Sequence, residues 1–315
     1  MPLPTPTLAA LKEAGLAPSI DAPLARRTWW QVGGPADGYL KVGTIEQVQA
    51  AVSICTQTEC PLFVLGNGTN LLISDRGIRG LVLQLGKELA RADTVDSRTP
   101  PLIDAGAGTR LAALVQKAMR SGWTGLEVFA GIPGTIGGAV RMNAGARLGE
   151  TKDVLVEVDA VLPDGTLRTL TQEALQMSYR TTLLPPGAVV VRARLQCTRE
   201  DAHQMRTQVK RHLDHRASTQ PLDLPSCGST FRNPPGDHAG RLIEAAGLKG
   251  FQIGDAQVSE KHANFIVNQG AATADDLRRV IEHVQATVQT QFGVSLQREV
   301  HMAGDWSHWE SGPSA

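Results

Sequence analysis

The chain has 315 residues, which favours two domains, and its 42% hydrophobic and 20% charged residues are typical of a globular protein. Lys plus Arg equals Asp plus Glu at 31 each, and aromatic residues are only 4%, so a nucleic-acid binder is disfavoured. The four cysteines form no CxxC pair, and His212 and His215 have no third ligand nearby, so no metal site is predicted. The N-terminus lacks a signal-peptide pattern and no segment is long and apolar enough to span a membrane, so we expect a cytoplasmic protein without membrane insertion.

The first half of the chain predicts short strands and helices separated by glycine turns. A helix is predicted over 44–58, with Thr44 and Gln47 in the positions of a capping box. Residues 61–85 predict strand, glycine loop, strand, turn and strand, and a further strand over 102–108 leads into a helix near 109–122. The apolar faces of the two helices are predicted to consist of Val48, Ala51, Val52 and Cys55, and of Leu111, Leu114, Val115 and Ala118.

The second half begins with a hairpin signal and ends in a long amphipathic helix. Two alternating runs over 154–170 are joined by Pro163-Asp164-Gly165, and an apolar strand follows over 188–197. A helix is predicted at 240–246, a strand at 264–267, and a helix that opens at Thr273. The run 294–302 alternates with period two, which predicts a strand with Glu299 on its polar side.

The composition also suggests where the domains begin and end. Residues 199–218 are polar and basic with helical spacing, and they follow directly after the apolar strand that ends at Cys197. We therefore predict an N-terminal extension at 1–20, a first domain at 21–197, a second domain at 198–305 and a loose tail at 306–315.

Two glycine-rich segments are candidates for binding an anion. The first, "LGNGTNLL" at 65–72, follows an apolar strand, and its glycines would let several backbone N–H groups converge on one ligand. Taken alone, this loop favours a plain hairpin-like turn, because it lacks the third glycine of GxGxxG and the Lys-Ser/Thr of a P-loop. The second segment is "AGIPGTIGGAVRMNAGA" at 130–146. Two such segments in one region favour an extended dinucleotide ligand laid across loops.

Several motifs then occur in a characteristic order. They are "LGNGTNLLISDRGIRGLVLQL", "GIPGTIGGAVRMNAGA", "SYRTT", "TQPLDLPSCGSTFRNP", "AGLKGFQIGDAQVSEKHANFIVN" and "LQREV". In this order the chain resembles the UDP-N-acetylenolpyruvoylglucosamine reductase family over roughly residues 24–304. The resemblance implies an α+β fold, in which an FAD-binding domain of the vanillyl-alcohol-oxidase type precedes a smaller substrate-binding domain.

The resemblance also implies the reaction and the residues that carry it. The expected activity is NADPH-dependent, FAD-mediated reduction of UDP-N-acetylglucosamine enolpyruvate to UDP-N-acetylmuramate, in peptidoglycan precursor synthesis. Arg180, Ser229 and Glu299 match the catalytic trio of the family. The residues expected to bind a non-covalent FAD are Gly66, Asn67, Gly68, Thr69, Asn70, Leu71, Gly131, Ile132, Pro133, Gly134, Thr135, Gly137, Gly138, Asn143 and Arg216. Those expected to bind substrate are Tyr179, Asn233, Lys261 and His262.

Two details of the motifs concern the family's subtypes. Arg180 and Ser229 are 229 − 180 = 49 positions apart, which resembles the shorter form of the family without an inserted tyrosine loop. Thr182 stands where serine is commoner, which affects local hydrogen bonding rather than the role of Arg180. For oligomeric state we expect a monomer or a weak oligomer.

The residue types suit the implied chemistry. Arg180 presents a planar fork of donors to a carboxylate that gains charge as hydride adds to the double bond. The α-carbon then needs a proton, for which the Ser229 hydroxyl is a candidate donor. A nucleophilic or capping role for Ser229 stays open on the residues alone, and Thr230 is an alternative donor. Glu299 could bond the substrate in a neutral form, since burial beside anions raises the pKa of a carboxyl.

Two other functions are weighed against this one. A non-covalent flavin oxidase of sugars or alcohols could share the architecture, although residues 61–75 contain no histidine that could tether FAD. A flavin- or sugar-nucleotide-binding regulator without turnover is disfavoured, because Arg180, Ser229 and Glu299 are all present.

Overall fold

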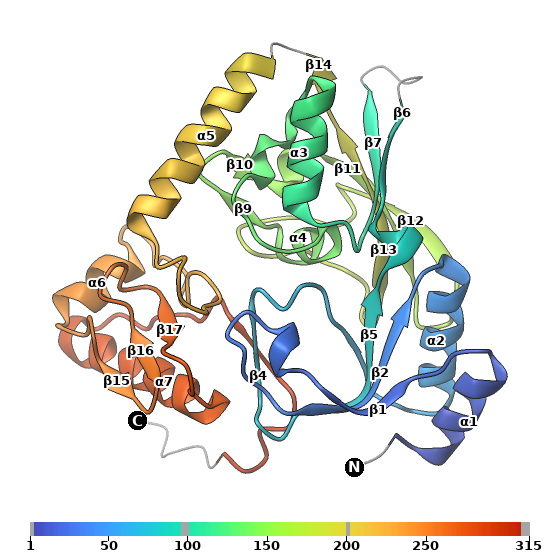
Figure 1. Ribbon diagram of the computed structural model, residues 1–315, viewed down its shortest axis with the longest axis horizontal. Coiled ribbons are helices and arrows are strands. Elements are labelled where there is room, and N and C mark those ends of the chain that lie inside the picture. The colour runs from blue at the N-terminus through green and yellow to red at the C-terminus, as the bar shows by residue number, and fades with distance from the viewer. Residues whose placement is uncertain (1–2, 96–100, 200–201, 310–315) are drawn as a thin grey trace.

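The computed structural model describes residues 3–95, 101–199 and 202–309. The first of the two larger sheets in its N-terminal lobe has the strand order β1-β2-β5-β3. Strands β2 and β3 both run parallel to β5, and the buried face of α2 packs against this sheet as predicted (Figure 1). The elements are α1 (Thr5–Glu13), β1 (Ser19–Pro23), β2 (Pro35–Val42), α2 (Ile45–Gln57), β3 (Leu62–Val64) and β5 (Ile78–Leu85). Residues 3–20, the described part of the predicted extension, belong to this layer, because Leu3, Leu11 and Leu16 lie in its core.

The capping of α2 differs from the prediction in one bond. Thr44 Oγ1 accepts from the Gln47 N–H at 3.3 Å, as expected, but Gln47 Oε1 accepts from the Gly43 N–H at 2.8 Å rather than from Thr44. The reciprocal half of the box is therefore displaced by one residue.

The second sheet is antiparallel throughout, with the strand order β12-β11-β13-β7-β6. It contains the predicted hairpin, and α3 buries the predicted apolar stripe beside it. The elements are β6 (Ala92–Val95), β7 (Leu102–Gly106), α3 (Leu111–Ser121), α4 (Ile136–Met142), β11 (Leu155–Val161), β12 (Leu167–Thr171) and β13 (Val189–Gln196). Two small two-stranded sheets accompany them. One pairs β8 (Trp123–Thr124) with β14 (Thr198–Arg199), and the other pairs β9 (Gly145–Ala146) with β10 (Gly149–Glu150). Short 3₁₀ turns cover Ala25–Arg27, Lys87–Ala90, Leu126–Phe129 and Thr151–Asp153.

Helix α4 lies inside the second glycine-rich segment, where no helix was predicted. Glycine disfavours helices, so the pattern indicated a loop. The structure gives a packing reason for Gly137, since a Cβ there would lie 3.1 Å from the Ala107 Cβ. The glycines bring α4 close to the residue that follows β7.

The long helix α5 (Ala202–Thr219) runs from the second sheet towards the C-terminal lobe (Figure 1). Its Met205 and Val209 are buried in the same core as Leu195 and Cys197 of the N-terminal lobe. The composition placed this helix in the second domain. In the structure, its N-terminal half packs against the first domain.

The C-terminal lobe combines the sheet β15-β16-β17 with α6 and α7. Its core also takes in Trp30, whose Nε1 donates to the Ile266 carbonyl at 2.7 Å. Strand β18 pairs in parallel with β4, which belongs to the N-terminal half of the chain. These contacts join the two lobes. The elements are β4 (Leu71–Ile73), α6 (Ala239–Ala245), β15 (Gln252–Ile253), β16 (Ala256–Val258), β17 (Ile266–Asn268), α7 (Ala274–Phe292) and β18 (His301–Ala303).

The strand predicted over 294–302 is wrong over most of its length. Only β18 is regular, and Arg298 forms one isolated bridge with Phe231. The alternation of burial is nevertheless real, because Leu296 and Val300 are buried while Glu299 is only partly so. The side-chain pattern reflected packing of an irregular segment.

Asp75 caps α7 from the other lobe. Its two carboxylate oxygens accept from the N–H groups of Ala274 and Asp275 at 3.0 and 3.1 Å, beside the predicted Thr273/Asp276 capping box. Asp75→Ala is expected to lower the free energy of unfolding by about 1 kcal/mol, because two N-terminal N–H groups lose their acceptor. Asp75→Asn, which keeps one acceptor oxygen, should lose less. Urea unfolding of both variants checks this, and an equal loss in the two would contradict it.

The last described residues also pack. Arg278 of α7 lies over the rings of Trp306 and Trp309, at 4.9 and 4.2 Å from their centroids, and His308 Nε2 lies 3.0 Å from the Asp275 carboxylate. Residues 306–309 of the predicted tail therefore lie against α7, and 310–315 fall outside the described residues. In the described part of the chain, no helix combines the length and apolar character needed to cross a membrane.

Candidate active site and cofactor cavity

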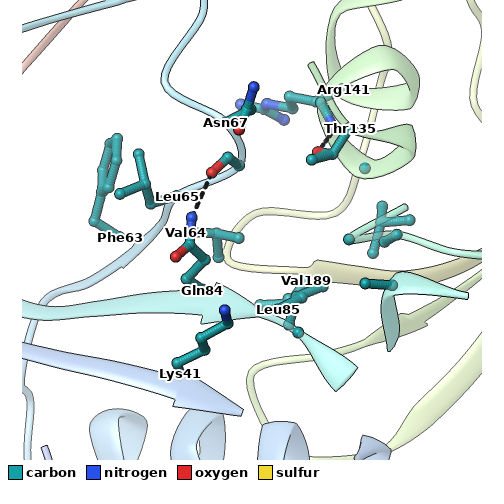
Figure 2. Close-up of a pocket in the computed structure, with 18 of the residues that line it drawn as sticks. Lys41, Phe63, Val64, Leu65, Asn67, Gln84, Leu85, Thr135, Arg141 and Val189 are labelled. Carbon is teal, nitrogen blue, oxygen red and sulfur yellow. Dashed lines mark hydrogen bonds between the residues drawn. The ribbon is translucent and has the colours of Figure 1, made fainter. Parts of the chain in front are cut away.

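Two adjoining cavities lie beside the first glycine-rich loop. The first, of about 1140 Å³, is bounded by Phe63, Leu65, Gln84 and Lys41 on one side and by Thr135 and Arg141 on the other (Figure 2). The second, of about 530 Å³, extends towards the C-terminal lobe. The two share the lining residues Trp29, Phe63, Val64, Gly66, Asn67, Thr135, Gly138 and Arg141. An extended ligand can therefore occupy both.

The first loop offers unpaired backbone donors. None of the N–H groups of residues 66–70 hydrogen-bonds any described residue. Gly68 has φ 62°, and a Cβ there would lie 2.1 Å from the Arg27 carbonyl oxygen, so only glycine fits. The loop is thus folded tightly and leaves donors for an anion.

The charge of the first cavity is one-sided. Its lining includes five cationic side chains, and no aspartate or glutamate from the described residues. A cavity of this size with only positive charge fits a dinucleotide with a diphosphate. The five are Arg26, Arg27, Lys41, Arg110 and Arg141. Sequence reasoning missed them, because they are scattered over four elements.

The second glycine-rich segment lies against the first. Thr69 Oγ1 donates to the Pro133 carbonyl at 3.2 Å, and the Gly134 carbonyl accepts from the Leu111 N–H at 3.1 Å. The predicted FAD contacts that line one or both cavities are Gly66, Asn67, Gly68, Thr69, Asn70, Leu71, Ile132, Pro133, Gly134, Thr135, Gly137, Gly138 and Arg216. Gly131 lies just outside, where a Cβ would be 2.8 Å from the Arg216 Cδ.

Asn143 does not lie in the cavities. It ends α4 in the left-handed region, at φ 41°, and it is fully buried. Its Nδ2 donates to Glu150 Oε2 and to the Ser178 carbonyl, each at 2.9 Å, and its Oδ1 accepts from the Lys152 N–H at 3.0 Å. These hydrogen bonds give Asn143 a structural role, because they hold α4 against the turn before Arg180, and its predicted contact with the cofactor stays a prediction.

Arg180, Ser229 and Glu299 all line the second cavity. Arg180 is at the apex of a tight turn and has φ 54°, a backbone conformation that non-glycine residues seldom adopt and that often marks functional sites. Its Nε donates to Glu299 Oε1 at 2.6 Å and its Nη2 to the Gly145 carbonyl at 2.9 Å. Nη1 has no partner among the described residues, so the guanidinium is fixed with one donor group left over.

Ser229 is held by backbone pairing on both sides. Gly228 has φ 75°, and the next residue, Thr230, donates its N–H to the Asn264 carbonyl at 2.8 Å. The Thr230 carbonyl in turn accepts from the Glu299 N–H at 2.8 Å. The positions of Ser229 and Glu299 are therefore coupled through Thr230. Within the described residues, nothing hydrogen-bonds the Ser229 hydroxyl.

Thr230 itself is turned away from the cavity. It is 1% exposed, is not among the lining residues, and its Oγ1 has no partner among the described residues. It is therefore poorly placed to replace Ser229 as a proton donor.

The glycine loop and the catalytic segment are tied together by Asn70. Its Nδ2 donates to the Glu299 carbonyl at 3.1 Å, and its own carbonyl accepts from the His301 N–H at 3.1 Å. Nearby, Thr182 Oγ1 donates to the Val140 carbonyl at 2.6 Å, so threonine satisfies its local hydrogen bonding at this position. Tyr179 is exposed beside Arg180, whose Cζ lies 5.1 Å from the ring centroid.

Arg216 enters the second cavity from α5. Burial lowers the pKa of its guanidinium, and no described residue forms an ion pair or hydrogen bond with it. Gln220, which lines the same cavity, has a buried Oε1 without a partner in the described residues. A desolvated cation without a protein counter-charge is suited to an anionic ligand.

His212 precedes Arg216 by one helical turn and is buried. Burial lowers its pKa, with smaller contributions from Arg216 and His215. The folded state therefore binds fewer protons than the unfolded state, so stability should fall as pH drops below about 6.5, the usual pKa of histidine. The melting temperature between pH 8 and 5 should fall less steeply in His212→Phe than in wild type. His215→Phe, on the exposed side of α5, is the control, and equal slopes in all three proteins would contradict the expectation.

Three predicted substrate residues lie outside both cavities. Asn233 Oδ1 accepts from the Ala239 N–H at the start of α6, at 3.1 Å. Lys261 Nζ donates to the Ala217 carbonyl at 2.7 Å. His262 packs edge-on against Phe265, and its Nδ1 accepts from the Asn264 N–H at 3.2 Å. The structure gives each a local structural role.

Residues that the sequence analysis did not identify complete the second cavity. Trp29 lines both cavities and is 44% exposed, and His301 lines the second. Asn264 holds the Ser229 segment, since its side chain accepts from the Phe231 N–H and donates to the Phe231 carbonyl. The alternating pattern of 294–302 placed His301 on the same side as Glu299, so the sequence contained a signal for His301. No local pattern distinguished Asn264 from other polar residues.

Comparison with known proteins agrees with this arrangement. The model of an FAD binding domain matches residues 36–171, and that of the UDP-N-acetylenolpyruvoylglucosamine reductase C-terminal domain matches residues 220–303. The enzyme of that name from Agathobacter rectalis is 42% identical over 91% of this chain and 94% of its own length. The one from Acaryochloris marina is 44% identical over 89% of this chain and 91% of its own.

The chain belongs to the UDP-N-acetylenolpyruvoylglucosamine reductase family. The crystal structure of the reductase from Thermus caldophilus superimposes with a TM-score of 0.79, at 38% identity, over 91% of this chain and 98% of that one. The fold expected from the sequence, an FAD-binding domain followed by the family's C-terminal domain, is confirmed. Membership makes the chain an FAD-dependent UDP-N-acetylmuramate dehydrogenase, which uses NADPH in peptidoglycan precursor synthesis.

Proposed function

We propose that the second cavity receives the enolpyruvyl group of UDP-N-acetylglucosamine enolpyruvate, and that Arg180, Ser229 and Glu299 carry out its reduction to UDP-N-acetylmuramate. The supporting observation is that all three line one cavity, which adjoins a dinucleotide-sized cavity with only cationic charge. The bound flavin supplies hydride to the terminal carbon of the double bond.

Arg180 binds the carboxylate that carries the developing negative charge. Its guanidinium is immobilised by Glu299 and by the Gly145 carbonyl, and Nη1 remains for the substrate. A donor fixed in advance stabilises an enediolate without reorganising during the reaction. The strained backbone at Arg180 is the cost of placing that donor.

Ser229 donates the proton to the α-carbon. Its hydroxyl lines the cavity without a protein partner, and its backbone neighbours fix its position. No described histidine hydrogen-bonds the Ser229 hydroxyl, which argues against a serine nucleophile activated by histidine. Proton donation is therefore the reading that we propose.

Glu299 positions Arg180. In the structure its carboxylate accepts a hydrogen bond of 2.6 Å from Arg180 Nε. Its backbone N–H, bound to Thr230, keeps Arg180 and Ser229 in register.

For the cofactor, we propose non-covalent binding with the diphosphate on the N–H groups of the 66–70 loop and on the cations of the first cavity. Arg216 provides a further cation towards the diphosphate of FAD or of the substrate. Tyr179, exposed beside Arg180, is the predicted substrate residue that we retain.

Three finer assignments rest on the same proposal. The spacing of 229 − 180 = 49 positions between Arg180 and Ser229 fits the shorter family form without a tyrosine loop. We also propose a cytoplasmic location, where the nucleotide-linked precursor and NADPH occur, and a monomer or weak oligomer.

The test is anaerobic NADPH oxidation by the purified flavoprotein, with and without UDP-N-acetylglucosamine enolpyruvate. We expect oxidation that depends on the enolpyruvyl sugar and yields UDP-N-acetylmuramate. Flavin that NADPH reduces but only oxygen reoxidises would instead support the flavin oxidase.

A further inference from the structure

Three side chains beside the first glycine loop form a chain of hydrogen bonds in which each group donates to the next. Arg27 Nη1 donates to the Tyr39 hydroxyl at 3.0 Å, the Tyr39 hydroxyl donates to Gln84 Oε1, and Gln84 Nε2 donates to the Gly66 carbonyl at 2.8 Å. Figure 2 shows the last bond as a dashed line from Gln84. Tyr39 fixes which end of the Gln84 amide faces Gly66, because only the amide oxygen can accept from its hydroxyl.

This chain determines the orientation of a peptide in the loop. In a trans peptide the C=O and N–H groups point in opposite directions. Holding the Gly66 carbonyl on Gln84 therefore directs the Asn67 N–H away from Gln84. That N–H has no partner among the described residues, and Asn67 lines both cavities. The peptide is thus set with a donor free for an anion.

The chain is anchored at both ends to the same loop. Arg27 Cζ lies 3.9 Å from the Tyr39 ring centroid, and the Arg27 backbone packs directly against Gly68. Tyr39 is buried, and burial raises the pKa of its hydroxyl, which therefore stays protonated and able to donate. Bonds arranged in one direction polarise one another, which strengthens the chain.

We propose that Gln84, oriented by Tyr39 and Arg27, is a positioning residue that presets the 66–70 loop for the diphosphate of FAD. Its expected effect is on the affinity of the apoprotein for FAD, since without Gln84 the peptide must be ordered when the ligand binds.

Gln49 provides a matched control. Its Nε2 also donates to a glycine carbonyl at 2.8 Å, that of Gly165, but it does so in the hairpin turn, and neither residue lines a cavity. Gln49→Leu removes one bond to a glycine carbonyl, and Gln84→Leu removes one bond of the same kind together with the bond that Gln84 accepts from Tyr39. Both variants can lower the stability of the apoprotein, but only Gln84→Leu should weaken FAD binding.

The experiment is titration of each apoprotein with FAD, followed by flavin fluorescence, with the melting temperature of the apoprotein as a second readout. Gln84→Leu should raise the Kd of FAD about fivefold to tenfold, the equivalent of one hydrogen bond. Gln49→Leu should leave it unchanged, and Tyr39→Phe should raise it less than Gln84→Leu. A Kd within twofold of wild type in Gln84→Leu, or an equal rise in Gln49→Leu, would overturn the proposal. If Gln84→Leu does not fold, Tyr39→Phe serves as the test. An unchanged Kd of Tyr39→Phe for FAD would then overturn the proposal.

Discussion

Replacing Ser229 with alanine is expected to slow reoxidation of the reduced enzyme by UDP-N-acetylglucosamine enolpyruvate by about 10²–10⁴, which corresponds to ~3–5 kcal/mol of barrier. The Ser229 hydroxyl lines the second cavity without a protein partner, so its removal leaves no protein bond broken. The backbone bonds of Thr230 that fix this segment also remain. The loss should therefore appear in the chemical step and not in folding.

Stopped-flow measurement of the two half-reactions checks this expectation. Reduction of the flavin by NADPH should keep its wild-type rate, whereas the second half-reaction should be slow. Ser226→Ala, which removes another hydroxyl from the lining of the same cavity, is the control. An unchanged second half-reaction in Ser229→Ala would remove this hydroxyl from the mechanism, and would direct attention back to Thr230.

Arg180→Lys is expected to lower kcat for reduction of the enolpyruvyl sugar by about 10²–10³, the usual effect of losing a preorganised donor at an oxyanion. Lysine keeps the charge, but a single ammonium group cannot bond Glu299, the Gly145 carbonyl and the substrate in the planar arrangement that arginine provides. Since φ is 54° at this position, lysine bears the same backbone strain as arginine.

The control for Arg180 is Arg192→Lys. Arg192 lies on β13 and forms an ion pair at 3.4 Å with Asp104 of β7. Arg192 lines neither cavity. Steady-state kinetics should show wild-type kcat for Arg192→Lys and the full loss for Arg180→Lys. A change confined to KM in Arg180→Lys would mean that Arg180 binds the ground state and transition state equally, which contradicts its proposed role.

The regular elements of this fold could be predicted from the sequence where one local pattern determined them. The stripe of α3, the hairpin at Pro163-Asp164-Gly165 and the capping box of α7 depend on neighbours within a few residues, and all were confirmed. Helix α4 was missed because its glycines meet a tertiary requirement, close packing beside Ala107, at the expense of helix propensity.

In the candidate site, only the residues that lie in recognisable sequence motifs could be predicted. Arg180, Ser229 and Glu299 were identified by family resemblance, and the structure brings them to one cavity. Asn143, a predicted cofactor contact, lies outside both cavities as a buried left-handed cap, and its position in the motif did not indicate this placement. The five cations of the first cavity come from four separate parts of the chain, so no single sequence window could reveal that they converge.

The most direct test of the account is a crystal structure of the oxidised FAD enzyme with UDP-N-acetylglucosamine enolpyruvate bound. We predict that the substrate carboxylate accepts a hydrogen bond from Arg180 and that the Ser229 hydroxyl faces the α-carbon of the enolpyruvyl group. An enolpyruvyl group bound away from the second cavity, with Arg180 still bonded only to Glu299 and Gly145, would contradict the proposed catalytic site.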